Sequence, residues 1–296
     1  EDLGKIQCAA GAKYAAKVAV LCDYDNEWDG IEDKWHGPLR GRSMDALFKA
    51  LQRAHIPFDF VNIDDAGTSA PLGGYDAVFY PHPTIITEAR TAQLEAYVQA
   101  GGRLVIGCRA GYKDINGQCP MTPMPGLLAK LTGCTVEEFT FLGPADAPES
   151  IDWAGTSVPA PVFNDVLCPE TADCAVLGTY VGNYYDGKPG LTAHPFGKGM
   201  VYAFGAVFSE AAVRRFVSLF DLGCPEAIEL PEAVEIAVRE SADGKRYVFL
   251  LNYTDQPQTI CVQDGKQYVD LLAESVLSGE TVMKPYDVLI LEAQGD

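Results

Sequence analysis

Residues 17–28 read KVAVLCDYDNEW, an apolar run that ends abruptly in acidic and aromatic side chains. The β-branched and apolar residues of 17–23, bounded by a charged turn, are typical of a buried strand. The residues that follow lie where this strand ends. The stretch therefore predicts the first strand of a sheet, with polar and aromatic side chains at its carboxyl end.

The next hundred residues repeat this alternation of strand and helix. Met44, Leu47, Phe48 and Leu51 have helical spacing, and a second helix is stopped by the glycines at 101 and 102. Helices separating apolar strands predict a parallel α/β sheet with crossover connections. We expect helices over residues 41–54 and 88–100, and strands over residues 56–63, 76–81 and 103–108.

The pattern changes in the second half. Residues 136–180 are short apolar pieces broken by prolines, which favours irregular or antiparallel insertions. Residues 191–195 and 200–205 flank a glycine-containing turn and predict a hairpin, and residues 210–220 predict a helix that closes the domain.

The last seventy or so residues show only strand signals. The pairs Asp243-Gly244 and Asp264-Gly265 supply hairpin turns between consecutive strands. We place the domain boundary within residues 223–231, which gives an α/β domain over 13–224 and a small antiparallel β domain over 225–296. The expected strands cover residues 234–239, 247–252, 259–262, 267–271 and 287–291.

Composition limits the partners of the chain. A formal net charge of −19 over 296 residues opposes binding to nucleic acid or anionic membranes, since both bind proteins through Lys and Arg. No apolar run reaches the roughly 18 to 20 residues of a membrane span, and the N-terminus shows no signal pattern. We expect a soluble, cytoplasmic protein. Because the chain begins Glu1-Asp2-Leu3 without Met, we also expect a piece of a longer protein.

Metal and cofactor sites find little support. The nine cysteines are scattered without a CxxC pair, and the four histidines have no ligand spacing. Free thiols in a reducing compartment fit the cysteines better than disulfides do. We therefore expect no metal and no cofactor.

Cys108 is the strongest candidate for a catalytic residue. It ends a predicted strand before a turn, where class I glutamine amidotransferases hold their nucleophile. That turn needs small residues two before and two after the cysteine, and here Ile106 and Ala110 stand there. His194-Pro195 falls where the partner histidine would be, but Phe196 replaces the glutamate that would orient it. A buried thiol that only fills space is the favoured interpretation.

Paired carboxylates offer no glycosidase site either. Glu137-Glu138 and Asp64-Asp65 are sequence neighbours. A glycosidase needs its two carboxylates about 5 to 10 Å apart across a sugar cleft. Neighbours on one strand point to opposite faces, so we interpret both pairs as solvated surface.

Two polar clusters at strand ends are the candidate site. The carboxyl ends of parallel strands line the crevice where ligands or partners dock, so aromatic and charged residues there indicate recognition. The alternative is a solvated loop with satisfied ion pairs. The candidate residues are Asp23, Tyr24, Asn26, Trp28 and Trp35 after the first strand, and Arg109, Lys113 and Asp114 after the fourth.

These segments together resemble family 42 β-galactosidases, over nearly the whole chain from Lys17 onward. The family is built from a catalytic TIM barrel, a middle trimerisation domain with an amidotransferase-like fold, and a small C-terminal β domain. One departure is Cys108, where relatives more often show Pro. The motifs that carry the resemblance are Asp23-Tyr24-Asp25-Asn26-Glu27-Trp28, Gly101-Gly102-Arg103-Leu104-Val105, Arg109-Ala110-Gly111-Tyr112-Lys113-Asp114, Pro125-Gly126-Leu127-Leu128, the stretch 133–138, Gly197-Lys198-Gly199, Phe249-Leu250-Leu251-Asn252-Tyr253-Thr254 and Pro285-Tyr286-Asp287-Val288.

The resemblance implies a class I glutamine amidotransferase-like, flavodoxin-like parallel sheet domain followed by an antiparallel β domain. It implies a homotrimer, a catalytic barrel elsewhere in the parent chain, and retaining hydrolysis of terminal β-D-galactosides by two glutamates of that barrel. A barrel takes about 250 residues and no eightfold βα run is present, so no residue here inherits a catalytic role. Two alternatives remain: a freestanding amidotransferase-like binding module, and a Cys108-based hydrolase or amidotransferase.

Overall fold

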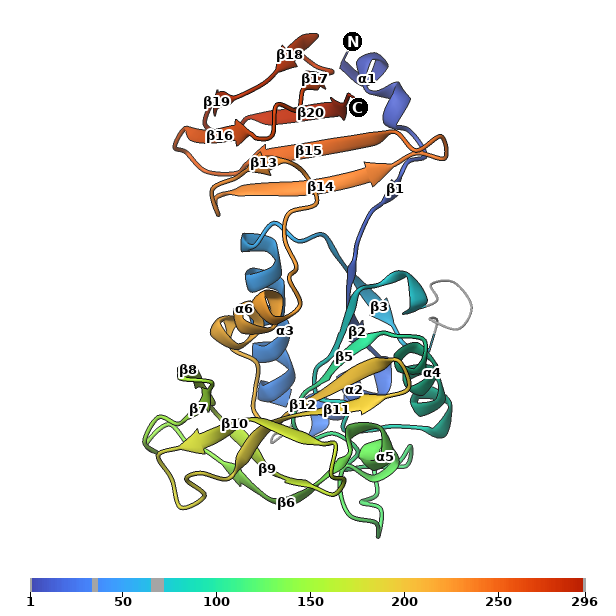
Figure 1. The fold of residues 1–296 in the computed structure, drawn as a ribbon, viewed down its shortest axis with the longest axis vertical. Helices are drawn as coiled ribbons and strands as arrows, with labels where there is room; N and C mark the ends of the chain where they lie inside the picture. Colours follow the sequence, from blue (N-terminus) through green and yellow to red (C-terminus); the bar gives the residue numbers. More distant parts are fainter. Residues whose placement is uncertain (1, 34–36, 65–71, 295–296) are drawn as a thin grey trace. The chain divides into compact units, whose positions relative to one another are not determined.

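The computed structural model describes residues 2–33, 37–64 and 72–294. The chain divides into two compact units (Figure 1). The larger unit comprises Val18–Phe48 and Asp59–Phe216, and the smaller comprises Glu1–Lys17, Lys49–Phe58 and Val217–Asp296. Within the described ranges, no helix is long and apolar enough to cross a membrane.

A mixed sheet of nine described strands organises the larger unit. From one edge to the other the strands are β3 (Phe58–Asn62), β2 (Val18–Cys22), β4 (Ala77–Tyr80), β5 (Arg103–Ile106), β12 (Gly199–Phe204), β11 (Pro189–Phe196), β10 (Ala175–Val181), β7 (Ser150–Trp153) and β8 (Thr156–Pro159). Strands β2, β4, β5 and β12 are parallel neighbours, as predicted for the first half of the chain. The pairs from β12 to β8 are antiparallel.

The parallel part of the sheet is as predicted, and the hairpin predicted from residues 191–195 and 200–205 is confirmed. Its strands are β11 and β12, and Phe196 pairs with Gly199 across a two-residue turn. So short a connection can only join antiparallel strands, because a parallel pair needs a crossover of a dozen or more residues. The sheet thus changes from parallel to antiparallel at β12.

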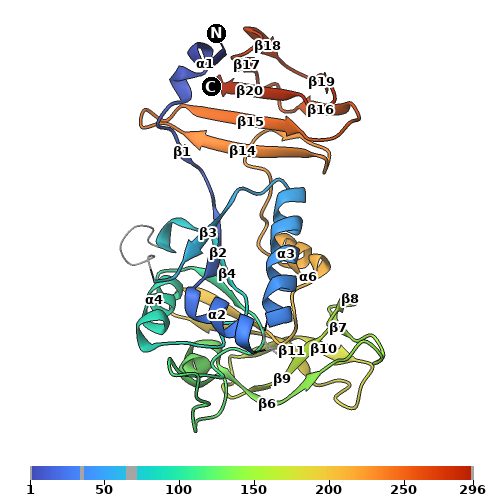
Figure 2. The same ribbon diagram turned by 180° about the vertical axis from the view of Figure 1, so that it is seen from behind.

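Helices cover both faces of the parallel strands. Ala19 and Leu21 of β2 pack with Leu94 and Val98 of α4 (Glu88–Gln99) in one core. On the opposite face, Phe79 of β4 meets Phe216 of α6 (Glu210–Leu219), with ring centroids 6.0 Å apart. Figures 1 and 2 show α3 (Gly37–Arg53) beside α6 on that face. The alternation of side chains along each strand explains why both faces are apolar.

Part of the insertion between β5 and β10 forms a second, smaller layer, with η3 (Gly126–Leu128), α5 (Ala129–Thr132), β6 (Cys134–Phe141) and β9 (Phe163–Pro169). The short helix η2 (Leu72–Gly74) lies earlier, before β4. Strands β6 and β9 pair antiparallel, with a register shift between Val136 and Glu138. This confirms the prediction of antiparallel insertions over residues 136–180.

The smaller unit is a β structure with its own apolar core. Its N-terminal segment contains α1 (Asp2–Lys5) and η1 (Gln7–Ala9). One sheet has the order β1 (Lys13–Tyr14), β14 (Val234–Glu240), β15 (Arg246–Asn252), β20 (Val288–Ala293), β17 (Tyr268–Asp270) and β18 (Ser275–Leu277); the other has β13 (Ile228–Glu229), β16 (Gln258–Val262) and β19 (Glu280–Met283). Val248, Leu250 and Ile260 are fully buried in the core of this unit.

One of the two predicted hairpins in this unit is wrong. The turn at Asp243-Gly244 joins the paired strands β14 and β15. Strands β16 and β17, on either side of Asp264-Gly265, belong to different sheets. A local Asp-Gly signal permits a tight turn, but long-range pairing of β16 with β13 and β19 decides where the strand lies.

Candidate functional site

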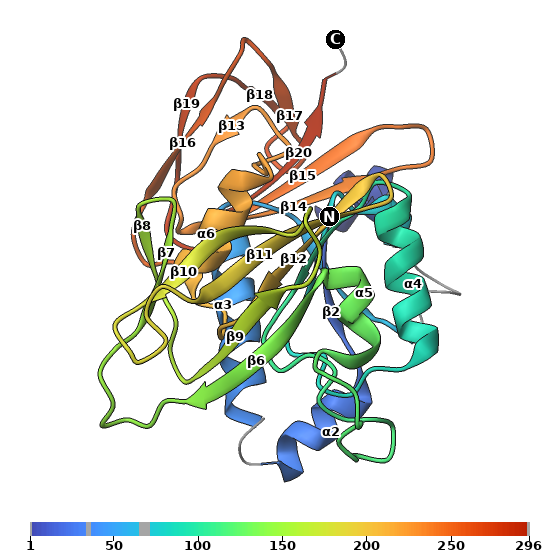
Figure 3. The same cartoon turned by 60° about the horizontal axis from the view of Figure 1, so that its bottom comes forward.

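The predicted site lies at the carboxyl ends of β2, β4 and β5. In the strand order β3-β2-β4-β5, the chain goes first to one side of β2 and then to the other. Open α/β sheets bind ligands in the crevice at such a switch point. Here β2 continues directly into α2 (Tyr24–Glu32), a helix that the sequence interpretation treated as a loop and that Figure 3 shows at the end of β2.

Asp23 and Asn26 fill this crevice with the protein's own polar groups. Asp23 caps α2, its Oδ1 accepting from the Asn26 N–H at 2.8 Å, and its Oδ2 accepts from the Tyr80 hydroxyl at 2.6 Å. Asn26 Nδ2 donates to the carbonyl of Ile85 after β4. Asp23 is 3 % and Asn26 2 % exposed, so these two residues are buried structural groups.

Arg90 of α4 completes this network, although the sequence analysis did not select it. Its guanidinium donates to Asp64 at 2.7 and 2.8 Å and to Asp25 at 2.6 Å, and it lies 3.4 Å from Asp23. The hydrogen bonds from Arg90 hold the pKa of Asp64 below its usual value. Asp65, its predicted carboxylate neighbour, lies outside the described residues.

Arg109 and Lys113, after β5, are paired with the other end of α2. Arg109 lies 3.0 Å from Asp33, and Lys113 lies 2.7 Å from Asp29 and 2.9 Å from Asp33. Partial burial opposes protonation of Lys113, but the bonds to both aspartates prevail and raise its pKa. Sequence reasoning missed Asp29 and Asp33, whose helical spacing became visible only once α2 was known.

Asp114 does not join these clusters. Its Oδ1 accepts from the backbone N–H groups of Asn116 and Gln118, each at 2.9 Å, and so closes its own loop. These bonds, with that from Gln118 foremost, lower the pKa of Asp114. It therefore acts as a turn residue.

Two aromatic candidates remain accessible. Tyr24 and Trp28 are 60 % and 62 % exposed and stack with centroids 5.7 Å apart. Ile31, one turn further along α2, is 71 % exposed. Trp35 lies outside the described residues. The charged candidates are thus paired within the fold, whereas Tyr24, Trp28 and Ile31 of α2 are exposed.

Cys108 has the surroundings of a packing residue. It is 2 % exposed among Leu39, Tyr112 and Phe163, and burial raises its pKa well above the usual value. Arg109, at φ 64°, takes the left-handed conformation after β5. A thiol held protonated in an apolar pocket is a poor nucleophile.

The histidine beside Cys108 is His82, which the sequence analysis did not propose for this role. His82 Nδ1 donates to the carbonyl of Cys108 at 2.8 Å, and its Nε2 lies 2.6 Å from Ser43 Oγ. His194 instead donates to the Leu131 carbonyl at 2.9 Å and lies 3.6 Å from Asp173. The structure does not form the Cys108–His194 pair that an amidotransferase-like reaction would need.

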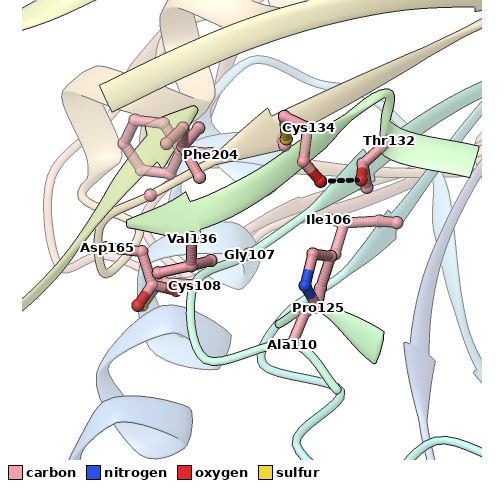
Figure 4. Close-up of a pocket in the computed structure, with 13 residues that line it drawn as sticks. Ile106, Gly107, Cys108, Ala110, Pro125, Thr132, Cys134, Val136, Asp165 and Phe204 are labelled. Atoms are coloured by element: carbon pink, nitrogen blue, oxygen red, sulfur yellow. Dashed lines mark hydrogen bonds between the residues drawn. The ribbon is translucent and has the colours of Figure 1, made fainter. Parts of the chain in front are cut away.

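Asp165 of β9 is a buried acid that no sequence motif marks. It accepts from the Arg109 N–H and from the Tyr112 hydroxyl, both at 2.6 Å. Burial raises its pKa to about 6 against the effect of these two donors. Figure 4 shows Asp165, Cys108 and Cys134 around a cavity of about 20 Å³, room for roughly one water. The cavity is too small for a sugar.

The described residues contain no group of three or more His, Cys, Asp or Glu placed to hold a metal ion. The cluster at the end of β2 consists of carboxylates already bound to Arg90.

Comparison with known families gives two adjacent matches. A family model described as the β-galactosidase trimerisation domain matches residues 16–221. One described as the β-galactosidase C-terminal domain matches residues 233–293.

Curated and solved relatives agree with these matches. The β-galactosidase BglY of Alicyclobacillus acidocaldarius is 29 % identical over 317 residues, which cover 99 % of this chain and 43 % of the relative. The crystal structure of the β-galactosidase from Rahnella sp. R3 has 26 % identity and a TM-score of 0.80, covering 98 % of this chain and 43 % of that one. That of Bacillus circulans sp. alkalophilus shares the fold with a TM-score of 0.86, at 24 % identity and coverages of 99 % and 44 %. The chain thus spans less than half the length of these relatives.

Proposed function

The chain belongs to the family 42 β-galactosidases, of which it carries the trimerisation and C-terminal domains, and we propose that it serves subunit assembly rather than catalysis. The observation that carries this proposal is the closed crevice at the end of β2. Asp23, Asn26 and Arg90 occupy the place where an α/β sheet of this kind would bind a ligand.

The proposed parent enzyme hydrolyses terminal β-D-galactosides by a retaining mechanism. Such a mechanism needs two carboxyl groups about 5 to 5.5 Å apart across a sugar cleft, one as nucleophile and one as acid and base. The acidic residues at the sheet end are bound instead to Arg90, Arg109 and Lys113. We therefore place both catalytic groups in a barrel outside this chain.

The assembly surface that we propose includes the exposed face of α2. Tyr24, Trp28 and Ile31 are apolar or aromatic residues on a helix whose other face is fixed by Asn26. Interfaces are enriched in exposed Tyr and Trp on preorganised elements. The partner is a second copy of the chain, because the matching family model describes a trimerisation domain. In a cyclic trimer this face meets a different surface of the neighbouring copy.

Light scattering over a range of protein concentrations tests assembly. We expect a trimer whose dissociation constant rises about 30-fold or more in Trp28→Ala, since a buried interface Trp contributes about 2 kcal/mol or more. Tyr253→Ala, which removes a 53 % exposed aromatic from the smaller unit, is the matched control and should leave the mass unchanged. A monomer at all concentrations would contradict assembly by this chain alone. A trimer that is unchanged in Trp28→Ala would show that the trimer interface does not include this face of α2.

Two finer features belong to the same proposal. We propose that the larger unit is an amidotransferase-like, flavodoxin-like domain. The order β3-β2-β4-β5-β12 supports this, because it is the 2-1-3-4-5 order of such sheets. We also propose a cytoplasmic parent, since buried and exposed cysteines alike are free thiols, as is usual in a reducing compartment.

A further inference from the structure

Two cysteines without a role in the proposed assembly pack against each other in the larger unit. Cys134 begins β6 and Cys174 directly precedes β10, and they share a small apolar cluster with Leu167 and Ala203. Cys134 is 1 % and Cys174 7 % exposed. Cys134 also lines the cavity of Figure 4, so it lies on the inner side of the pair.

Backbone bonds fix the two segments that carry these thiols. Gly133, at φ 65°, ends α5 and turns the chain into β6. Its carbonyl accepts from the N–H of Glu170 at 2.9 Å, and Cys174 N–H donates to Thr171 at 3.1 Å. The thiol of Cys174 points to the Thr132 carbonyl at 3.7 Å, directly beside Cys134. These backbone bonds fix both segments, so the fold holds the two thiols next to each other.

Both thiols of the pair have polar groups beside them. The Thr192 hydroxyl donates to Cys134 Sγ at 3.7 Å, and the ring of His194 lies 3.6 Å from Asp173, the residue before Cys174. Gly133 permits this arrangement, because a Cβ there would come within 2.5 Å of the His194 ring. A histidine and hydroxyl donors next to a thiol favour its thiolate form.

The two thiols differ in acidity. A hydrogen bond from the Cys134 thiol lowers the pKa of Cys174 to about 7, with Thr192 and His194 acting in the same direction. The same bond and burial raise the pKa of Cys134. Cys174 is also the more exposed of the two thiols, so it is the one that an oxidant reaches first, and Cys134 lies beside it in the same cluster.

We propose that Cys134 and Cys174 are a peroxide-sensitive thiol pair that closes to a reversible disulfide. The Cys174 thiol releases its proton, the thiolate attacks one oxygen of hydrogen peroxide, and the O–O bond breaks to leave a sulfenic acid on Cys174. The leaving hydroxide combines with the released proton to form water. Sγ of Cys134 then attacks the sulfenic sulfur of Cys174. The S–S bond forms, the S–O bond breaks, and the departing hydroxide takes the Cys134 proton as a second water.

Oxidation of the full chain with graded hydrogen peroxide, followed by alkylation of the remaining thiols and mass spectrometry, tests this inference. Cleavage after Lys, Arg and Glu places the two cysteines in separate peptides, 131–137 and 171–198, and Cys168 in a third. We expect these two peptides linked as the main oxidised product, and released by dithiothreitol. The link should raise the melting temperature by roughly 5 to 10 °C, because it closes a loop of about 40 residues.

Three variants separate this pair from general thiol oxidation. In Cys134→Ser the sulfenic acid of Cys174 has no partner and should be trapped by dimedone. In Cys174→Ser, Cys134 should stay reduced. Cys168→Ser, which removes a half-buried thiol six residues before Cys174, should leave the link intact. Peroxide that oxidises the exposed Cys119 while peptides 131–137 and 171–198 stay reduced and unlinked would overturn the proposal.

Discussion

Asn26 and Ile85 exchange two hydrogen bonds: the Ile85 N–H donates to Asn26 Oδ1 at 2.7 Å, and Asn26 Nδ2 donates to the Ile85 carbonyl at 2.9 Å. A side-chain amide thus imitates a strand neighbour and fixes α2 to the loop after β4. This attachment closes the crevice of the sheet and presents Tyr24 and Trp28 to solvent.

Asn26→Ala should destabilise the larger unit by about 2 to 4 kcal/mol, because it leaves the buried N–H and carbonyl of Ile85 without their partner and removes the side-chain bonds of Asn26 to Asp23. Urea unfolding followed by circular dichroism measures the loss. Asn116→Ala, at an exposed position, is the control and should stay within about 0.5 kcal/mol of the parent. Equal midpoints for the two variants would show that the Asn26 bonds contribute little.

Arg90→Met should cost about 3 to 5 kcal/mol, since it leaves Asp23 buried without its cation and Asp25 and Asp64 unpaired. Arg90→Lys keeps the charge but loses the planar fork, so an intermediate loss is expected. Denaturant unfolding gives both values. The exposed Arg42→Met serves for comparison, and a loss in Arg90→Met no larger than in that variant would argue against the network.

Asp165 should make the stability of the larger unit depend on pH. Its pKa is about 6 in the folded chain and 3.8 as a reference, so the folded state holds the proton more tightly. The resulting stability is fully present below pH 3.8 and is lost as the pH rises through about 6. Asp165→Asn mimics the protonated form and should gain up to about 3 kcal/mol relative to the parent between pH 4 and 7. Parallel pH–stability curves for the two proteins would contradict the raised pKa.

Cys108 should resist alkylation in the folded chain, because it is buried and its pKa is raised. We expect iodoacetamide to modify it at least roughly a hundredfold more slowly than the exposed Cys119, until urea unfolds the protein. Peptide mass spectrometry over time follows both sites. Rapid labelling of Cys108 in the native protein would instead support the hypothesis of a Cys108-based hydrolase.

The chain alone should not hydrolyse a chromogenic β-galactoside above the rate in buffer, because its strand-end carboxylates are held in ion pairs. A continuous absorbance assay at high protein concentration checks this, with a complete family 42 enzyme as the positive control. Hydrolysis well above buffer that persists after repurification would place a catalytic pair within this chain.

Local pattern sufficed for many elements of the fold. Residues 17–23 predicted a strand that the structure places at Val18–Cys22, and the residues after it carried the family motif. The antiparallel insertions were predicted, but not that β10, β7 and β8 continue the parallel sheet, because strand order across the insertion between β5 and β12 depends on long-range pairing. Strands as short as β13 and β18 were missed because two or three residues carry no periodic signal.

The sequence by itself determined the family, the alternation of helices and strands, and the positions of Asp23 and Asn26 after one strand and of Arg109 and Lys113 after another. Only the tertiary structure decided which charges are satisfied. Arg90 meets Asp25 from 65 residues away, and Cys134 meets Cys174 from 40 residues away. Contacts between residues far apart in the sequence depend on how the chain folds, and no local spacing encodes them. The structure therefore showed both that ion pairs fill the predicted crevice and that the two cysteines are neighbours.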